Sequence, residues 1–380
     1  MKVLFLTEFY SNTAGADVHG GVELRSFFLS QGIADTHDVT VVAVREAGTD
    51  YEQQIGRVRV VRPGPVAKFR QAGGYLSRLR YLIAARRVIV AQKPDIIVAE
   101  NFLAYAIMLT LSAAWQRRTI VTYHDVWVGT WIRHAGLFMG VAGEIIERGV
   151  FRKPWRRYVA NSQITKEKLI NHGVNAERIT VVYNGIDRTA IEKIPAEHFT
   201  NPTIISVARL VKYKRIDDLL GAFALILQSK PEVRLVVVGS GPEQQALQRL
   251  AAELGVEAAV TWRGFVPQYQ DVLAAVKGAQ VFSLPSAVEG FGIVTLEAMA
   301  CRTPFVSSDI PPTREVIGPE LYSALYPLGD IPELARRIMT LLSDEAQRRD
   351  QASKGWVRSG AYDWQQSIAQ FEKILEPDSV

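Results

Sequence analysis

Short apolar runs alternate with longer helix-forming segments along the whole chain, and this alternation limits the possible folds more than any other feature. Continuous apolar runs between helices are typical of parallel strands that helices cover on both faces. The series occurs twice, so the sequence predicts an α/β fold with two doubly wound parallel sheets. The strand candidates are Val3–Leu6, Val39–Val44, Val58–Val61, Ile96–Ala99, Ile120–Tyr123, Tyr158–Ala160, Ile204–Val207, Leu235–Val238, Val260–Trp262, Val281–Leu284 and Phe305–Val306.

The length of the chain also indicates two domains. At 380 residues the chain exceeds the size at which a single hydrophobic core usually stops growing. A polar stretch with two prolines, Glu192–Pro202, indicates the boundary. We expect an N-terminal domain over 1–195, a C-terminal domain over 196–361 and a final helix over 362–380.

Composition excludes several classes of protein. A hydrophobic content of 48% and a charged content of 22% are those of a globular protein. The single cysteine, Cys301, excludes a disulfide framework and agrees with a cytoplasmic location. The start, Met1–Thr7, has the pattern of a buried strand, so we expect no secretory signal. The apolar segment Phe102–Trp115 has 14 residues, too few to span a membrane, and predicts one buried helix.

Two glutamates eight residues apart, Glu289 and Glu297, indicate the function most directly. The strand candidate Gln280–Leu284 precedes them and Gly290-Phe291-Gly292 lies between them, so the local order is strand, glycine turn, helix. The free N–H groups at the start of such a helix suit a diphosphate. Glu297, inside the helix, suits a diol, and Glu289, in the turn, suits a polyol. The segment predicts a nucleotide-sugar site; the alternative is a core helix with two incidental glutamates.

This segment resembles the Glu-x7-Glu signature of the family 4 retaining glycosyltransferases, which have the GT-B fold of two Rossmann-like domains. The resemblance extends from Gly20 to about Trp364. It implies that Glu297 binds ribose hydroxyls, that Glu289 binds a sugar hydroxyl and that the final helix crosses back to the first domain. The further donor-binding residues that it implies in this segment are Phe291, Gly292 and Ile293.

A basic loop follows the strand candidate Ile204–Val207, with four cations between Arg209 and Arg215. Ligands bind at such strand ends in doubly wound sheets, although a basic loop can also be a solvated surface. The resemblance matches Arg209 and Lys214 to the family's Arg-x4-Lys pair, which implies that they stabilise the diphosphate as leaving group. The family usually has glycine at position 215, so the geometry of this turn and a phosphate contact from Arg215 are open questions.

Two glycine loops join this set by resemblance. Gly239 and Gly241 follow a strand candidate without the full Gly-x-Gly-x-x-Gly fingerprint of dinucleotide sites, and the family's loop at this place approaches the nucleotide. Gly20 and Gly21 precede a helix and would lie under the donor phosphates and sugar, where side chains would collide. The segment Trp262–Val266 would border the base, with a core position for Trp262 as the equal alternative.

His124 follows the strand candidate Ile120–Tyr123 and matches the family's histidine beside the reacting sugar. The resemblance therefore implies a retaining hexosyltransferase whose catalytic residues are His124, Arg209, Lys214 and Glu289. Its donor would be a UDP- or GDP-linked sugar, and its acceptor a glycan or lipid-linked molecule of polysaccharide or glycolipid biosynthesis. No Asp-x-Asp motif occurs, so we expect no metal and no cofactor, with charge neutralised by Arg, Lys and a helix dipole.

Three alternatives have different chemistry. A nucleotide-sugar epimerase or phosphorylase could use the same fold, and a non-catalytic protein could bind a nucleotide sugar. A nicotinamide oxidoreductase is disfavoured by the missing glycine fingerprint.

Charge is divided unequally along the chain. Residues 1–199 hold 26 Lys and Arg against 18 Asp and Glu, whereas residues 200–380 hold 18 against 21. The stretch Lys68–Lys93 has seven cations and no acid, together with a helical apolar stripe, and Phe151–Arg157 is a second basic, aromatic segment. A solvated surface helix would explain this pattern, and no motif indicates nucleic acid. The more specific hypothesis is peripheral attachment to an anionic membrane surface.

Overall fold

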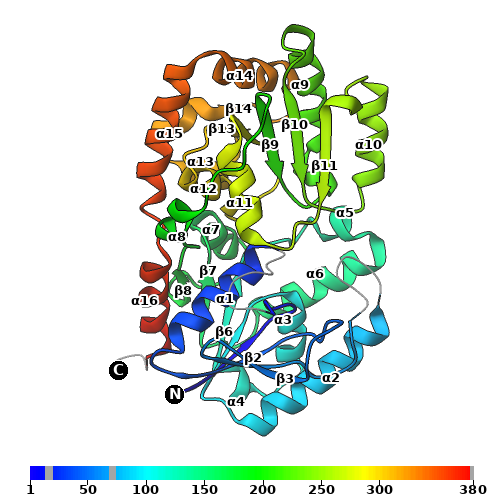
Figure 1. Cartoon of the computed structure of the whole chain (residues 1–380). Coiled ribbons are helices and arrows are strands. Elements are labelled where there is room, and N and C mark those ends of the chain that lie inside the picture. Colours follow the sequence, from blue (N-terminus) through cyan, green and yellow to red (C-terminus); the bar gives the residue numbers. More distant parts are fainter. Residues whose placement is uncertain (13–19, 68–73, 377–380) are drawn as a thin grey trace. The chain divides into compact units, whose positions relative to one another are not determined.

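The computed structural model describes residues 1–12, 20–67 and 74–376. Its internal contacts divide the chain into two compact units (Figure 1). Unit 1 contains Met1–Gly185 and Trp364–Val380, and unit 2 contains Ile186–Asp363. The predicted boundary lay at 195/196, but residues before it already contact unit 2: Lys277 Nζ donates to the carbonyl oxygens of Ile191, Glu192 and Ile194.

Unit 1 is built on an eight-stranded sheet in the order β3-β4-β2-β1-β5-β6-β7-β8. Every neighbouring pair is parallel except β3 and β4, which form an antiparallel hairpin at one edge. The strands are β1 (Lys2–Leu6), β2 (Asp38–Val42), β3 (Glu52–Ile55), β4 (Val58–Val61), β5 (Ile96–Ala99), β6 (Thr119–Tyr123), β7 (Arg157–Ala160) and β8 (Ile179–Val181).

Helices cover both faces of this sheet. One core contains residues of α2, α3 and α6, and a second core contains residues of α1 and of α16, the last helix of the chain. In the second core Phe371 packs against Phe5 of β1, with ring centroids 6.1 Å apart. The prediction that the final helix returns to the first domain is therefore confirmed. The helices are α1 (Gly21–Ile33), α2 (Tyr75–Gln92), α3 (Phe102–Leu109), α4 (Ala113–Gln116), α5 (Trp131–Ala135), α6 (Leu137–Phe151), α7 (Gln163–Asn171) and α16 (Trp364–Leu375).

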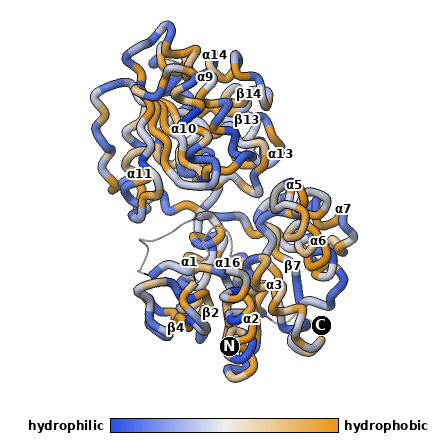
Figure 2. The backbone as a smooth tube through the Cα atoms, turned by 90° about the vertical axis from the view of Figure 1, so that its right-hand side faces the viewer, coloured by the Kyte–Doolittle hydropathy of each residue, from blue (hydrophilic) through white to orange (hydrophobic). Residues whose placement is uncertain are grey.

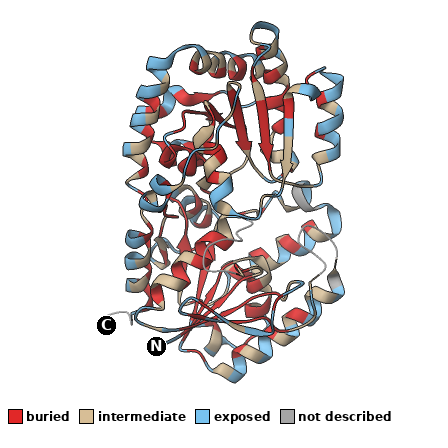
Figure 3. Cartoon of the chain, in the orientation of Figure 1, coloured by how far each residue is buried: buried red, intermediate tan, exposed pale blue. Residues whose placement is uncertain are grey.

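Unit 2 is built on a six-stranded sheet in the order β11-β10-β9-β12-β13-β14, and all its pairs are parallel. Figure 3 marks most of these strands as buried and the outer helical faces as exposed. The strands are β9 (Thr203–Val207), β10 (Arg234–Val238), β11 (Val260–Gly264), β12 (Val281–Leu284), β13 (Phe305–Ser308) and β14 (Leu325–Tyr326). The helices are α8 (Arg188–Lys193), α9 (Ile216–Ser229), α10 (Gln244–Glu253), α11 (Tyr269–Gly278), α12 (Ile293–Ala300), α13 (Pro311–Ile317), α14 (Ile331–Ser343) and α15 (Glu345–Ser359).

Both sheets reverse the direction of strand order at one point. In unit 1, strands β2 to β4 lie on one side of β1, and β5 to β8 lie on its other side. In unit 2, β10 and β11 lie on one side of β9, and β12 to β14 lie on its other side. A crevice opens outside the carboxyl ends of the strands at such a switch point, and ligands bind there in doubly wound folds. The predicted architecture of two doubly wound domains is confirmed.

The sequence missed three strands and predicted one helix wrongly. β3, β8 and β14 were not expected, and Phe102–Trp115 forms two helices, α3 and α4, instead of one. Polar side chains end α3 by bonding to its last carbonyl groups: Thr110 Oγ1 donates to Ile107 O at 2.7 Å, and Gln116 Nε2 donates to Met108 O at 3.4 Å. Such side-chain bonds compete with continuation of the helix.

Within residues 1–12, 20–67 and 74–376, no helix is both long enough and apolar enough to cross a bilayer.

Candidate functional site: strand-end loops at the two switch points

The two residues predicted to contact the donor's phosphate and sugar meet at the switch point of unit 2. Lys214 follows β9 and Glu289 follows β12, and these strands are neighbours in the sheet. Lys214 Nζ lies 2.5 Å from Glu289 Oε1, and the two side chains are only 13% and 9% exposed. The backbone fixes this approach, since Ala287 N donates to Tyr213 O at 2.7 Å. The sequence predicted both residues but not their ion pair.

Gly239 and Gly241 let the β10 loop lie against the β9 loop. A Cβ atom at Gly239 would lie 2.0 Å from Ala208 O, and one at Gly241 would lie 2.2 Å from Leu210 O. Backbone bonds join the loops on both sides, from Leu210 N to Ser240 O and from Glu243 N to Leu210 O, each 3.0 Å. Close packing between loops therefore already requires glycine at both positions, and the predicted approach of this loop to a nucleotide stays a prediction.

The turn between Glu289 and α12 leaves the start of that helix open. Gly292 has φ +85°, a left-handed conformation that glycine adopts without strain, and no side chain in the described part of the chain caps the helix. By helix geometry the N–H groups of Ile293 and Val294 point out of the first turn without a helical partner. Phe291 is buried against Tyr362, with ring centroids 5.5 Å apart, so its side chain holds the turn in place.

Glu297 lies on α12 and is 5% exposed. Tyr269 Oη donates to Glu297 Oε1 at 2.6 Å. Burial raises the pKa of the Glu297 carboxyl to about 7, against the opposing effect of the tyrosine bond. Glu297 therefore changes charge near neutral pH, a property that the sequence did not predict.

The remaining cations of the β9 loop differ in their environment. Arg209 is exposed and has no ion pair among the residues that the structure describes. Arg215 has φ +53°, the left-handed conformation that explains why the family prefers glycine there. Its guanidinium makes two bonds to the buried Asp218 carboxylate, at 3.0 and 2.5 Å. The phosphate contact considered for Arg215 is not supported, because this side chain is already bound to Asp218.

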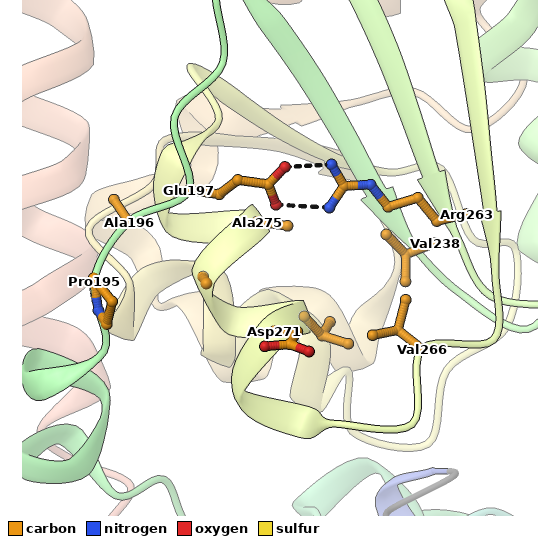
Figure 4. Close-up of a pocket in the computed structure, with 10 residues that line it drawn as sticks. Pro195, Ala196, Glu197, Val238, Arg263, Val266, Asp271 and Ala275 are labelled. Carbon is orange, nitrogen blue, oxygen red and sulfur yellow. Dashed lines mark hydrogen bonds and ion pairs between the residues drawn. The ribbon is translucent and has the colours of Figure 1, made fainter.

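A pocket of about 590 Å³ opens at the carboxyl ends of β10 and β11. Figure 4 shows Glu197 and Arg263 facing each other on one side of it, joined by two bonds of 2.7 and 2.5 Å. Val238 and Val266 line another side, and the Asp271 carboxylate lies at the start of α11. Apolar walls with a few fixed polar groups are typical of small-molecule sites. The pocket includes Arg263 and Val266 of the segment predicted to border a base.

In unit 1 the strand ends carry a separate polar group. His124 follows β6, and its Nε2 lies 3.4 Å from Oε2 of Glu100, which follows β5 and is fully buried. Asn161 Nδ2 donates to His124 O at 3.0 Å. Arg25 of α1 is fully buried, and burial lowers its pKa to about 10 against the opposing charge of Glu100. The predicted histidine thus has a carboxylate partner.

Gly20 and Gly21 lie at the start of α1. Gly20 is in extended backbone with φ 174°, and a Cβ atom there would meet nothing within 4 Å. Packing against the residues that the structure describes therefore does not require glycine at 20, and its predicted place under the donor stays a prediction.

Sequence reasoning missed four partners of the predicted residues. They are Tyr269 for Glu297, Asp218 for Arg215, Glu100 for His124, and Glu197 for Arg263. Asp218 could have been found, because it lies three residues after Arg215 at the start of a helix. The other three come from elements that are distant in sequence, and only the order of the strands brings them close.

Family models match almost the whole chain in two parts. Residues 19–190 match the model described as Glycosyltransferase Family 4, and residues 187–356 match the model described as Glycosyl transferases group 1. Among curated proteins, a lipopolysaccharide 1,6-galactosyltransferase of Salmonella typhimurium is 30% identical over 205 residues, which are 53% of this chain and 56% of that protein. The chain spans about half the length of the curated relatives it matches.

Solved structures of glycosyltransferases share the fold. Sucrose-phosphate synthase of Thermosynechococcus elongatus has a TM-score of 0.80 at 21% identity, covering 98% of this chain and 97% of that one. Anabaena HepE in complex with UDP-glucose has a TM-score of 0.76 at 21% identity, covering 98% of both chains. At these identities the likeness establishes the GT-B fold alone.

The bond from Arg215 to Asp218 yields a prediction about stability. Arg215→Gly removes a left-handed strain of about 1–2 kcal/mol, but it leaves a buried carboxylate without its partner, which costs about 3–5 kcal/mol for a fully buried pair. Because Arg215 is 37% exposed, solvent reduces that cost, and we expect a net loss of about 1–2 kcal/mol in urea unfolding.

Lys93→Gly is the matched control. Lys93 also has a left-handed φ, +49°, but it is exposed and forms no ion pair among the described residues. This variant should be as stable as the parent or more stable. An Arg215→Gly protein that gains stability as Lys93→Gly does would contradict the importance of the Asp218 bond.

Proposed function

The chain belongs to the glycosyltransferases of family 4 and group 1 with the GT-B fold, and on this premise we propose that it moves a sugar from a nucleotide-diphosphate sugar to a glycan or lipid-linked acceptor. The donor would be UDP- or GDP-linked, and the anomeric configuration would be retained. The observation that carries this proposal is the pairing of Lys214 with Glu289 at the switch point of unit 2, beside the open N-terminus of α12.

The diphosphate fits the cationic side of this switch point. Lys214 supplies a charge that one carboxylate, Glu289, balances among the described residues, and Arg209 supplies an exposed guanidinium on the same loop. The open N–H groups at the start of α12 add the positive end of a helix dipole. These groups would neutralise the charge that develops on the leaving diphosphate without a metal ion. Backbone hydrogen bonds between neighbouring loops support this arrangement, because they hold the loop that carries Lys214 and Arg209 at the end of β9.

The two glutamates would divide the rest of the donor. Glu297, buried on α12 with one oxygen bound by Tyr269, would accept bonds from the ribose hydroxyls through its ionised carboxylate. Glu289, in the turn, would hold a sugar hydroxyl once the diphosphate has taken over Lys214. The pocket between Val238, Val266 and Arg263 would receive the base. The half-buried pair of Glu197 and Arg263 in this pocket can satisfy the edge of a base by hydrogen bonds.

Retention would follow from substitution on one face of the sugar. A double displacement needs a carboxylate beside the anomeric carbon, and Glu289 is assigned to a hydroxyl instead. In the proposed step the bond from the anomeric carbon to the phosphate oxygen breaks as a bond to the acceptor oxygen forms on the same face. The acceptor proton passes to the departing phosphate oxygen. His124, held near the Glu100 carboxylate, would orient the reacting sugar.

A cytoplasmic enzyme with a lipid-linked acceptor would work at a membrane surface, and α2 of unit 1 supports such attachment. Its buried face is formed by Tyr81, Ala85 and Ile89. Its exposed side chains combine apolar and cationic groups without an acid, namely Leu76, Leu79, Arg80, Ile83, Arg86, Arg87 and Val90.

The structure changes three details of the basic stretch. Lys68 and Arg70 lie outside the described residues. Arg78 pairs with Glu8 at 3.8 Å, so it is not one of the outward cations. In the second basic segment Trp155 is a core residue, and Arg156 donates to the carbonyl oxygen of Glu376 at 2.6 Å. Trp155 and Arg156 therefore support the fold, and the proposal of membrane attachment depends on α2.

The first prediction from the proposed function concerns turnover. Lys214→Ala should lower kcat by about two orders of magnitude or more, because one electrostatic contact to the leaving group is lost. A transfer assay with nucleotide sugar and acceptor, with separation of the glycosylated product from free sugar, also distinguishes a transferase from an epimerase or a binding protein. Activity should persist in excess chelator. Lys212→Ala, on the same loop, is the control; equal turnover of both variants and the parent would exclude the role of Lys214.

The second prediction separates the glutamates by calorimetry with bare nucleoside diphosphate. Glu297→Gln should weaken binding by about tenfold or more, because a charged acceptor of the ribose is lost. Glu289→Gln should not weaken it, yet should damage transfer. Equal losses in the two variants would contradict the division of roles.

The raised pKa of Glu297 adds a pH dependence to this measurement. Because its carboxyl has a pKa of about 7 when folded, the form that accepts ribose hydroxyls is lost as the pH falls from 8 to 6. Diphosphate affinity of the parent should fall over this range more steeply than that of Glu297→Gln, which shares every titration of the ligand itself. Parallel pH profiles would show that Glu297 does not titrate at the site.

The third prediction concerns attachment. Replacing Arg80, Arg86 and Arg87 with Gln should lower binding to anionic vesicles at low salt by about two orders of magnitude, because each cation contributes about 1 kcal/mol. A variant with Arg336, Arg349 and Lys354 of unit 2 changed to Gln has the same change in net charge and should bind like the parent. Equal losses in both variants would mean that total charge, not α2, determines binding.

A further inference from the structure

Unit 1 carries a second surface that neither the donor site nor α2 explains: the outer face of the α5–α6 hairpin. Five large apolar side chains are exposed there, namely Ile132 at 51%, Leu137 at 62%, Phe138 at 89%, Val141 at 42% and Ile145 at 66%. Figure 2 colours much of α6 as hydrophobic. On α6 these residues occupy positions i, i+1, i+4 and i+8, so they form one stripe along the helix.

The opposite face of α6 explains why this stripe cannot turn inward. Gly140 and Gly143 lie so close to α5 that a Cβ atom would be 2.5 Å from Ile132 Cα at the first and 2.5 Å from the Trp131 ring at the second. Glu147 on the same face is buried and accepts a bond from Trp131 Nε1 at 2.5 Å. The small and polar residues thus fix the inner side of the helix.

The polar and apolar side chains of α6 are therefore distributed in the reverse of the usual way, with the large apolar ones outside. The inner face holds a carboxylate, whereas Arg148 is the only charged residue of α6 that is exposed. Monomeric soluble proteins rarely expose contiguous apolar surface of this kind unless it contacts another molecule. Burial of each large side chain is favourable by the hydrophobic effect, so the stripe is suited to an apolar partner.

We propose that the stripe Leu137–Ile145 inserts into the interfacial region of an anionic lipid surface, with α2 as the electrostatic part of the same contact. Both helices pack on α3 and cover the same face of the unit 1 sheet, and Figures 1 and 2 show them on the same side of the unit. Cations flank the stripe, since Arg133 and Arg152 are exposed near its two ends.

Charge favours a lipid surface over a protein partner or a second copy of the chain. On α2 the exposed apolar side chains lie among Arg80, Arg86 and Arg87, and on the hairpin Arg133 and Arg152 supply the cations, because Arg148 is paired with Glu144 at 2.6 Å. Amphipathic helices that lie in a membrane interface combine an apolar face with Lys and Arg in this way. A second copy would bring the same arginines against one another. The inference extends the membrane attachment in the proposed function, but it depends on different residues.

The test is sedimentation of the full-length protein with vesicles of phosphatidylglycerol and phosphatidylcholine, at low and at high salt. Phe138→Ser with Ile145→Ser should lower the partition coefficient by about tenfold or more, because two exposed apolar groups no longer leave water on binding. At high salt the parent should keep part of its binding, because apolar insertion is not screened. The double variant should keep none.

Val357→Ser is the matched control, since Val357 is 73% exposed on α15 of unit 2. It should bind vesicles like the parent. All variants should keep the parent's thermal unfolding and its affinity for nucleoside diphosphate, because the changed side chains are exposed. If the parent protein itself does not bind nucleoside diphosphate, the proposed function is wrong, whereas the result with vesicles stays valid.

Two outcomes would overturn the inference. One is unchanged partition of the Phe138→Ser, Ile145→Ser protein at both salt concentrations. The other is a parent that sediments as a dimer in solution and becomes a monomer in the double variant, since the stripe would then be an interface between copies.

Discussion

The ion pair between Lys214 and Glu289 is the interaction on which the donor site depends. Both side chains are largely buried, so their charges have lost most of their hydration. Such a pair is stabilising only if the two groups meet in good geometry. Their geometry is set by the sheet: β9 and β12 are neighbours at the switch point, so the loops that follow them meet. The same pair keeps the loops together before any ligand is present. It also means that a diphosphate must compete with Glu289 for Lys214, which links phosphate binding to release of a carboxylate toward the sugar.

The loops around this pair are held by backbone contacts that few residues permit. Gly239 and Gly241 allow carbonyl groups of the β9 loop to approach within distances that no side chain would tolerate. Arg215 occupies a left-handed position where glycine would be unstrained, and its bond to Asp218 offsets that strain. Both features serve the same purpose, which is to present Lys214 and Arg209 at the strand end in one conformation. Preorganised charge of this kind costs no reorganisation when the leaving group develops its own charge.

The sequence predicted the layered fold because its buried parallel strands are continuous apolar runs. It missed β3, whose Glu-Gln-Gln-Ile sequence is that of an exposed antiparallel edge, and β14, which has two residues. It singled out Lys214, Glu289, Glu297 and His124 because they match motifs of the family at the ends of predicted strands or in the helix that follows one. It could not pair them, because Tyr269 reaches Glu297, and Glu100 reaches His124, only through the order of strands and the packing of helices. The exposed stripe on α6 was also missed, since an apolar helix in a sequence predicts burial until its inner face is seen to be occupied.

The central claim is that the donor diphosphate replaces Glu289 as the partner of Lys214, and a double-mutant cycle on diphosphate affinity tests it most directly. Affinity is measured by calorimetry for the parent, Glu289→Gln, Lys214→Met and the double variant. If the claim holds, Glu289→Gln tightens binding several-fold in the parent, because Lys214 is freed, and has no effect when position 214 is methionine. A Glu289→Gln change that weakens binding, or that acts equally in both backgrounds, would contradict the claim.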